Sequence, residues 1–330
     1  MINEFERIIK SNTCMPILKS ASIMITGATG TIGYYLVSLL LYYNDAYNAN
    51  IKLYCPVRNI QKAKKMYGNA KDLFFVEYEL NQACTFDFEV DYVIHCAGPT
   101  RSAYMVQYPV DTINAVYGGT EKLLHFFKNN GRKGFLYVSS VEIYGENYDA
   151  DKILTEETVG AVDTLKVRSS YPEAKRLAEN LCVAYANPYG VPIKIVRLTQ
   201  ILGKSDGDNR LIAYLCDCAK NKQNIVLKSD GNAIKAYCYI ADCVSAMLYT
   251  LVKGENIAYN VANEEMALSV YQLAKYVSQK YLDGGVTTEN GDSKIYPKSS
   301  VLVMDSKKLR DLGWNPEFGL EESFEKLIEG

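Results

Sequence analysis

The sequence predicts an α/β fold, a doubly wound parallel sheet with a smaller C-terminal lobe. Two features indicate it. Short apolar runs alternate with helical stretches as far as Leu198, and a glycine-rich turn follows the first of these runs. Continuous apolar strands separated by helices are typical of a parallel sheet whose two faces are both covered by helices.

Six apolar runs at the spacing of a βα repeat are the predicted strands of this sheet. In chain order they are Ile23–Ile25, Ile51–Cys55, Leu73–Val76, Tyr92–Ala97, Phe135–Val138 and Ile193–Leu198. After Gly203 the pattern loosens, so we expect the main domain over residues 1–203, with late strands around 234–262 returning to it. Residues 204–233 and 263–330 are expected to form the smaller lobe.

The glycine-rich turn, Gly27-x-x-Gly30-x-x-Gly33, leads from the first strand into a helical pattern. In such a turn the first glycine permits the tight bend, the second lets backbone N–H groups approach a pyrophosphate, and the third lets the helix pack against the strand. The helix N-terminus adds about half a positive charge where phosphates would bind. The alternative is a purely structural turn. The residues expected to bind a dinucleotide here are Gly27, Thr29, Gly30, Thr31, Ile32 and Gly33.

The composition is that of an ordinary globular enzyme. The 330 residues are 48% hydrophobic and 22% charged, with a net charge of -2 and no basic block, which argues against nucleic-acid and membrane partners. Nine cysteines include no Cys-x-x-Cys pair, and only His95 and His125 are present, so no metal site and no Ser-His-Asp triad is expected. We expect His95 to be packed at a strand end and His125 to lie on the surface. Because the first residues lack a signal-peptide pattern, we expect a cytoplasmic protein.

Candidate catalytic residues end the fifth strand and open a later helix. Ser139 and Ser140 follow Val138, and ligands of such sheets bind beyond the carboxyl ends of the strands. Tyr171 and Lys175 are four residues apart, so both face the same side of a helix. A neighbouring ammonium, together with the positively charged nicotinamide ring of a bound dinucleotide, lowers the pKa of a phenol from about 10 towards neutrality. Tyr171 would then transfer a proton while Ser140 hydrogen-bonds the reacting oxygen.

The spacing Tyr-x-x-x-Lys alone is not specific, because it occurs six times in this tyrosine-rich chain. The tyrosines that begin these pairs are Tyr67, Tyr148, Tyr171, Tyr249, Tyr271 and Tyr276. Only Tyr171 combines the pair with an upstream strand-end serine pair and a glycine-rich turn in the same sheet. The alternative for Tyr171 is an ordinary helix face.

With these residues the chain resembles, over essentially its whole length, the extended short-chain dehydrogenase/reductase family, the nucleotide-sugar epimerases and dehydratases. The family's Ser/Thr, Tyr and Lys correspond to Ser140, Tyr171 and Lys175. The resemblance implies a Rossmann fold, an NAD(P) cofactor, a nucleotide-sugar substrate, a role in polysaccharide biosynthesis and a homodimer. The cofactor contacts expected in addition are Glu79, Leu80, Ala97, Gly98 and Lys175, and the expected substrate contacts are Arg168, Gln200 and Lys235.

Within the family, Ser139–Gly145 and Arg168–Glu179 are most similar to the UDP-glucuronate decarboxylase branch, where Glu142 would assist catalysis. The Asp-Glu pair of the 4,6-dehydratases is replaced here by Val141-Glu142, which removes the acid needed for water elimination. Lys235 stands where decarboxylases have arginine, and an ammonium lacks the bidentate fork that holds a carboxylate. Gln200 stands in place of a common substrate-binding asparagine. A structural partner for a backbone amide is the alternative role of Glu142.

The second strand and its end, Ile51–Asn59, lack the carboxylate that usually binds the adenosine ribose. Arg58, helped by Lys62, could instead pair with a 2'-phosphate, so NADP(H) is favoured slightly over NAD(H). The alternative is that Arg58 stacks on adenine or faces solvent. Because family members that reduce their substrates commonly use NADPH, the cofactor choice favours net reduction.

Three functions follow from these observations. The leading hypothesis is an NAD(P)(H)-dependent enzyme that reduces a nucleotide-linked keto sugar. The second is decarboxylation or epimerisation with internally recycled NAD, in which Glu142 takes part. The third is a dinucleotide-binding protein without catalytic activity, against which the complete set of Ser140, Tyr171 and Lys175 argues.

Overall fold

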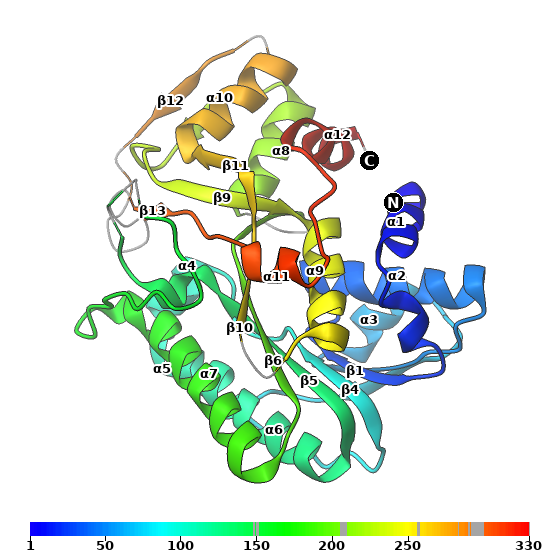
Figure 1. The fold of residues 1–330 in the computed structure, drawn as a ribbon. Helices are drawn as coiled ribbons and strands as arrows, with labels where there is room; N and C mark the ends of the chain where they lie inside the picture. The colour runs from blue at the N-terminus through cyan, green and yellow to red at the C-terminus, as the bar shows by residue number, and fades with distance from the viewer. Residues whose placement is uncertain are drawn as a thin grey trace.

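Seven parallel strands form the main sheet in the order β10-β6-β5-β4-β1-β2-β3 (Figure 1). This computed structural model describes residues 1–147, 149, 152–204, 210–255, 258–282, 284–289, 291 and 300–329. The six predicted strands are all present, and the doubly wound parallel fold is confirmed. The strands of this sheet are β1 (Ser22–Thr26), β2 (Lys52–Val57), β3 (Leu73–Glu77), β4 (Val90–His95), β5 (Gly131–Ser140), β6 (Ile193–Leu198) and β10 (Ala258–Val261).

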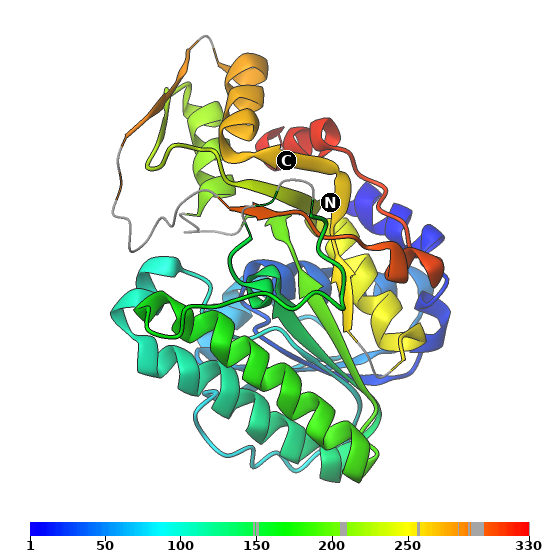
Figure 2. The same cartoon turned by 60° about the vertical axis from the view of Figure 1, so that its left-hand side comes forward.

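Two layers of helices cover the sheet, one on each face (Figure 2). Side chains alternate along the strands, so Ile23 and Ile25 pack in one apolar cluster and Met24 in the other. The first layer contains α2 (Thr31–Tyr47), α3 (Ile60–Tyr67) and α9 (Ile240–Lys253). The second contains α6 (Gly119–Asn130) and α7 (Ser170–Tyr189), and the short helices α4 (Ser102–Gln107) and α5 (Pro109–Ile113) precede α6.

A second, smaller sheet lies beyond the carboxyl ends of the main strands (Figure 1). It joins β7 (Gln200–Leu202), β9 (Ile234–Tyr239), β11 (Asn263–Ser269) and β13 (Val301–Leu302). Of the late strands expected around 234–262, β10 pairs with β6 in the main sheet, whereas β9 lies in this second sheet. The rest of this lobe comprises β8 (Ile225–Leu227), β12 (Val286–Thr288), α8 (Leu211–Asn221), α10 (Val270–Tyr281), α11 (Lys307–Asp311) and α12 (Leu320–Glu329).

The chain first passes from the main sheet to the second sheet at a single residue, Thr199, which separates β6 from β7. Its hydroxyl donates to the Ala236 carbonyl in β9, and its backbone N–H donates to the Val261 carbonyl in β10. Both sheets are therefore fastened together at this point. Gln200, one of the predicted substrate contacts, follows directly and begins β7.

An N-terminal helix that the sequence analysis did not predict, α1 (Ile2–Ser11), packs on α2 and α9. Its buried Glu4 accepts hydrogen bonds from the hydroxyls of Tyr35 and Tyr239, at 2.8 and 3.1 Å. Arg7 pairs with Glu317 near α12. The two ends of the described chain therefore lie side by side (Figures 1 and 2).

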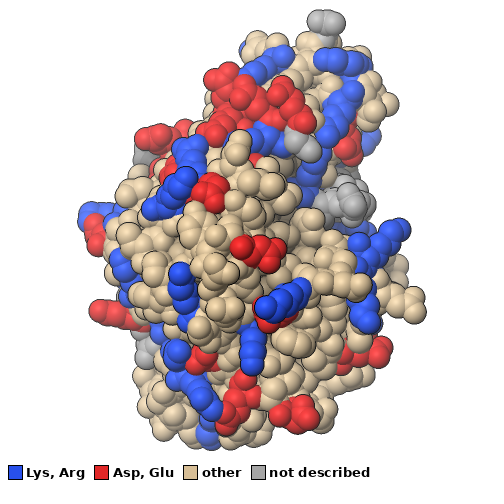
Figure 3. Space-filling model, turned by 90° about the vertical axis from the view of Figure 1, so that its right-hand side faces the viewer, with Lys and Arg blue, Asp and Glu red and all other residues tan. Residues whose placement is uncertain are grey.

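The surface carries both signs of charge. On the face shown in Figure 3, acidic and basic side chains are interspersed without a field of one sign. Within the described residues, no helix has the length and apolar character needed to cross a bilayer. All nine cysteines are free, and seven of them are buried.

Candidate functional site

The glycine-rich turn has the shape that the sequence predicts. Gly27 has a φ of +73°, and a Cβ there would lie 2.9 Å from the Ala97 nitrogen. A Cβ on Gly33 would lie 2.2 Å from the Gly27 carbonyl oxygen, so α2 approaches the turn more closely than any side chain allows. The Gly30 N–H donates to the Gly27 carbonyl at 2.9 Å. Because no side chain of the described residues caps α2 at Gly30, its first turn suits a diphosphate.

The other predicted cofactor residues lie around this turn. Ala97 and Gly98 follow β4, the neighbour of β1, and the Ala97 N–H donates to the Thr26 hydroxyl at 3.2 Å. Space around Gly98 is open. Glu79, which is exposed, and Leu80 follow β3 at the far edge of the sheet. Glu79, Leu80, Ala97 and Gly98 therefore all follow the carboxyl ends of parallel strands, as Gly27 does, and so lie at the same end of the sheet.

Two residues that the sequence analysis missed contact the turn. The Tyr67 hydroxyl, at the end of α3, donates to the Ala28 carbonyl at 2.5 Å. Arg210, just before α8 in the smaller lobe, donates to the Thr31 hydroxyl at 2.9 Å. No sequence motif marks either residue, because each contacts a distant part of the chain. Tyr67 is 39 residues from Ala28, and Arg210 is 179 residues from Thr31.

Arg58 and Lys62 lie just past β2 and are exposed. Asn59 caps α3 by accepting the Lys62 N–H at 2.8 Å, which turns the chain sharply after Arg58. No carboxylate replaces the missing ribose-binding residue within Lys52–Asn59. The carboxyl end of β2 is therefore followed by basic side chains and not by a carboxylate.

Ser140, Tyr171 and Lys175 meet at the carboxyl end of β5. Pro172 lies in the first turn of α7, which places Tyr171 and Lys175 one turn apart on the face towards the sheet. The Lys175 Nζ lies 5.8 Å from the centre of the Tyr171 ring and donates to the Val138 carbonyl at 2.7 Å. Ser140 ends β5, and its Oγ accepts the Glu142 N–H at 3.2 Å. The structure therefore brings the three predicted catalytic side chains together.

The protonation of Tyr171 differs from the sequence-based expectation. Burial and the nearby Glu142 carboxylate raise the pKa of Tyr171, and this outweighs the lowering by a hydrogen bond with Ser140 and by Arg168. The phenol is therefore neutral near pH 7, because the protein groups alone do not give the lowering that is expected with a nicotinamide ring nearby. Burial lowers the pKa of Lys175 to about 8, while Glu179 raises it. Lys175 is thus mostly charged at pH 7 but close to its titration point.

The predicted substrate contacts Arg168 and Lys235 surround Glu142. The Arg168 Nη2 lies 2.8 Å from the Glu142 carboxylate and 3.4 Å from the Ser102 hydroxyl. Arg168 is also 5.7 Å from the centre of the Tyr171 ring. Burial lowers the pKa of Lys235, the Glu142 charge raises it and Arg168 lowers it. Two cations and one carboxylate therefore share the space beside Tyr171.

Arg168 retains donors that nothing in the described chain uses. Its Nε and Nη1 are buried and have no hydrogen-bond partner among the described residues. Buried guanidinium nitrogens without partners are costly unless a ligand satisfies them. These two donors are therefore available to a ligand, in addition to the bond that Arg168 makes to Glu142.

Gln200 lies next to the strand that carries Lys235, whereas Val141 belongs to an apolar cluster. Gln200 is half-buried and pairs in register with Tyr237 of β9, the strand that carries Lys235. The Tyr237 hydroxyl is buried without a partner among the described residues. Val141 instead packs into an apolar cluster with Ile143. Val141 is therefore part of the core and offers no polar group to the cluster around Glu142.

The remaining predicted features lie outside this cluster. His95 is buried at the end of β4, between the hydroxyls of Thr26 and Thr120, and burial lowers its pKa to about 3. His125 is exposed on α6. No group of histidine, cysteine or carboxylate side chains within the described ranges could hold a metal. Among the other Tyr-x-x-x-Lys pairs, Tyr148 lies outside the described residues. The tyrosines of the rest lie on α3, α9 and α10, away from Ser140, and are Tyr67, Tyr249, Tyr271 and Tyr276.

Comparisons with known proteins agree with the site and the fold. The chain is 27% identical, over 96% of its length, to a trifunctional UDP-glucose 4,6-dehydratase/UDP-4-keto-6-deoxy-D-glucose 3,5-epimerase/UDP-4-keto-L-rhamnose-reductase of Arabidopsis thaliana, and it spans about half (48%) of that protein. It is 24% identical to UDP-glucuronic acid decarboxylase 6 of the same plant, over 93% of this chain and 88% of the relative.

Among solved structures, UDP-glucose 4-epimerase of Thermotoga maritima with UDP-glucose has the same fold. The TM-score is 0.78 at 21% identity, over 93% of this chain and 97% of that one. The family model described as "NAD dependent epimerase/dehydratase family" matches residues 23–262, which span the glycine-rich turn, the Ser140, Tyr171 and Lys175 set and β10. The chain therefore belongs to the NAD-dependent epimerase/dehydratase family, as its resemblance to the extended short-chain dehydrogenases/reductases indicates.

Proposed function

We propose that this enzyme transfers a hydride on a nucleoside-diphosphate sugar and that its net reaction is reduction of a nucleotide-linked keto sugar. The observation that carries this proposal is the convergence of Ser140, Tyr171 and Lys175 beside the glycine-rich turn. The neutral Tyr171 phenol supports the direction, because a phenol that keeps its proton can give it to a carbonyl oxygen.

Each residue has a distinct part in this reaction. The bound nicotinamide cofactor supplies the hydride. Tyr171 donates the proton to the substrate oxygen, and Ser140 orients that oxygen from the end of β5. Lys175, fixed by the Val138 carbonyl, holds the positive charge that favours the phenolate left behind. Arg168, Gln200 and Lys235 are the proposed substrate contacts.

The cofactor would lie across the carboxyl edge from Gly27 to Lys175. We propose that NADP(H) binds more tightly than NAD(H), because the exposed Arg58 follows β2 where a ribose-binding carboxylate is absent. The fit of the diphosphate is supported by the contact between Gly33 and the Gly27 carbonyl, which leaves no room for a side chain.

A second function is favoured by one observation. The decarboxylases to which this chain is similar act on UDP-glucuronic acid, and Lys235 alone would hold a carboxylate poorly. Arg168, however, brings to the same cluster two guanidinium nitrogens that have no hydrogen-bond partner among the described residues. We infer that decarboxylation of a nucleotide-linked uronate, with Glu142 assisting, is the reaction to test against net reduction.

A substrate panel separates the two reactions. Purified protein would be incubated with UDP-, CDP-, GDP- and dTDP-linked sugars and keto sugars, and reduced cofactor and released carbon dioxide would be measured in parallel. Net reduction predicts stoichiometric consumption of reduced cofactor by a keto compound, with UDP-glucuronate a poor substrate. Rapid release of carbon dioxide from UDP-glucuronate without net cofactor change would establish the decarboxylase instead. The variant Arg168→Lys should then lose more activity on the uronate than on neutral sugars.

We also propose a homodimer located in the cytoplasm. Leu177 and Val183 on α7 are each about half exposed, at 47% and 46%, as expected of a helix that a second copy covers. Free, mostly buried cysteines suit a reducing compartment. Light scattering coupled to size-exclusion chromatography measures the mass, and a charged residue at Leu177 should yield monomers.

A further inference from the structure

A buried ion pair lies one helical turn beyond the candidate catalytic lysine. Glu179 follows Lys175 by four residues on α7, so the two side chains share a face of the helix. The Arg197 guanidinium in β6 contacts the Glu179 carboxylate through Nη2 at 2.7 Å and through Nε at 3.1 and 3.2 Å. Their side chains are only 11% and 13% exposed. The chemistry proposed above assigns no part to this pair.

Lys175 is surrounded by groups from four elements. Glu179 and Cys182 face it from α7 together with the Tyr171 ring, and the Tyr137 ring lies 4.7 Å below it on β5. His95 and Cys96 approach from the end of β4, and Glu142 from the turn after β5. Of the charged groups, Glu179 has the largest effect in favour of the ammonium, and burial opposes it. Among the charged neighbours of Lys175, the carboxylate of Glu179 therefore does most to offset the effect of burial.

Arg197 in turn is held by residues outside α7. Its Nη1 donates to the Tyr144 hydroxyl at 3.0 Å and to the Glu156 carbonyl at 2.9 Å. The Tyr144 hydroxyl donates to the Asn260 side chain of β10 at 2.6 Å. Most N–H donors of Arg197 are used in these bonds, so the guanidinium is held in a single orientation. The Glu179 carboxylate is held in place with it.

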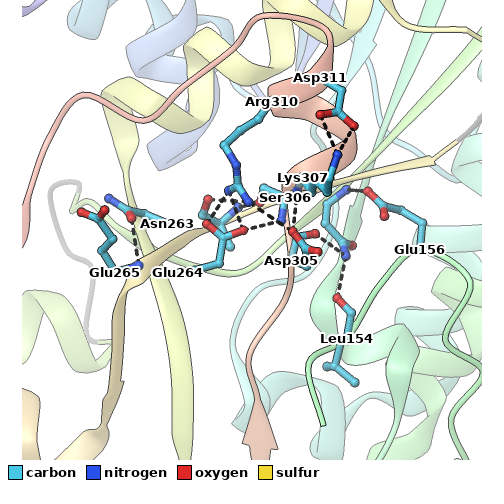
Figure 4. Close-up of polar contacts among 12 residues, drawn as sticks. Leu154, Glu156, Asn263, Glu264, Glu265, Asp305, Ser306, Lys307, Arg310 and Asp311 are labelled. Atoms are coloured by element: carbon cyan, nitrogen blue, oxygen red, sulfur yellow. Dashed lines mark hydrogen bonds and ion pairs between the residues drawn. The ribbon is translucent and has the colours of Figure 1, made fainter. Parts of the chain in front are cut away.

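The same network ends in the C-terminal segment. Asn260 donates through Nδ2 to the carbonyls of Leu154 and Asp305, at 3.0 and 3.1 Å, and its N–H donates to Glu156 at 2.7 Å. Figure 4 shows Leu154, Glu156 and Asp305 drawn together around this junction. Tyr144 also ends the turn Val141–Tyr144, which contains Glu142. One polar network thus reaches from the second lobe to the helix and the turn that carry the candidate catalytic groups.

We propose that Glu179 and Arg197 form a positioning pair for Lys175, in which Glu179 keeps the lysine charged and Arg197 holds Glu179 in place. The assignment rests on the proposed function only in treating Lys175 as catalytic. At a solvent-exposed site such a carboxylate would have little effect on the pKa of a lysine. Lys175 and Glu179 are buried, however, and a carboxylate shifts the pKa of a neighbouring ammonium most strongly in buried surroundings.

The test measures Lys175 itself and then turnover. NMR titration of the ligand-free protein with labelled lysine, assigned through Lys175→Arg, gives the midpoint of its ammonium. In Glu179→Gln this midpoint should fall by roughly one pH unit or more, and the alkaline limb of kcat should move to lower pH by a similar amount. Glu179→Asp should restore most of both. The control is Glu173→Gln on the same helix, whose carboxylate lies 3.5 Å from Arg176 and is 38% exposed, and it should leave the midpoint unchanged.

An unchanged midpoint in Glu179→Gln, or an equal fall in Glu173→Gln, would overturn the proposal. Removing Glu179 alone leaves the Arg197 charge buried without its partner, and that variant could fail to fold. The double variant Glu179→Gln/Arg197→Met removes both charges and should still lower the midpoint, because Glu179 and not Arg197 is the group that acts on Lys175. A wild-type midpoint in the double variant would refute the assignment. Because the titration uses no substrate, it stands even if the proposed reaction is wrong.

Discussion

Replacing Gly33 by alanine tests whether the glycine-rich turn binds the cofactor diphosphate. The new Cβ would lie 2.2 Å from the Gly27 oxygen, 2.7 Å from its carbonyl carbon and 2.9 Å from the Ala28 Cα. All three atoms belong to backbone, so no flexible side chain can yield. The separation from the oxygen must open by at least about 0.8 Å before it reaches the shortest contacts that real Cβ atoms make. The first turn of α2 must therefore move away from the turn that precedes it.

That displacement has a calculable effect on binding. If two charge-assisted hydrogen bonds from the turn to the diphosphate are lost, at about 1.5 kcal/mol each, affinity falls by about 3 kcal/mol, or roughly 10²-fold. Calorimetric titration with NADPH and NADH measures it. Gly319→Ala is the matched control, because a Cβ at Gly319 meets no atom within 4 Å. If Gly33→Ala binds both dinucleotides within threefold of wild type while keeping its melting temperature, the diphosphate does not lie on this turn.

Three further predictions concern catalysis, cofactor choice and pH. Tyr171→Phe should lower turnover by about 10²-fold or more with dinucleotide affinity unchanged, and Tyr271→Phe, in another Tyr-x-x-x-Lys pair, should have no effect in the same steady-state assay. Arg58→Ala should weaken NADPH binding more than NADH binding in calorimetry, and a wild-type preference for NADH would contradict the 2'-phosphate assignment. Burial raises the pKa of Asp242 from its ordinary 3.8 to about 7. The folded state therefore favours the protonated carboxyl, so the free energy of unfolding should fall as pH rises from about 4 to 7, and urea unfolding of Asp242→Asn should show a flatter pH dependence.

The sequence allowed the main sheet and the glycine-rich turn to be predicted because their signals are local. Apolar runs define buried parallel strands, Gly27 is favoured by its positive φ, and Gly33 is required by its close contact with the Gly27 carbonyl six residues earlier. The approach of Tyr171 to Lys175 was equally predictable, because spacing along one helix fixes it. Lys235 was named as a substrate contact only through family resemblance, and the structure places it close enough to Glu142 for that charge to raise the pKa of Lys235.

What could not be predicted depends on contacts between distant segments. The second sheet takes its strands from four separate parts of the chain, and no periodicity marks the two short ones, β7 and β13, which have three and two residues. The bond from Arg210 to Thr31 and the pairing of Arg168 with Glu142 have no local pattern. The raised pKa of Tyr171 in the ligand-free protein could not be predicted, because its largest cause is burial, which a single sequence does not give.

The order of strands has a consequence for how the protein can be divided. The main sheet takes its edge strand β10 and its covering helix α9 from a stretch of chain that lies between β9 and β11 of the second sheet. Neither half is therefore continuous in sequence, and a fragment ending at Gly203 would lack an edge strand and would leave the apolar surface under α9 open to water. We expect the two halves to unfold in a single cooperative transition and proteolysis to yield no stable half. Exchanging the whole smaller lobe as one continuous segment would also remove α9 and β10 from the main sheet. Changes of sequence in this lobe are therefore expected to be confined to shorter segments, such as its loops.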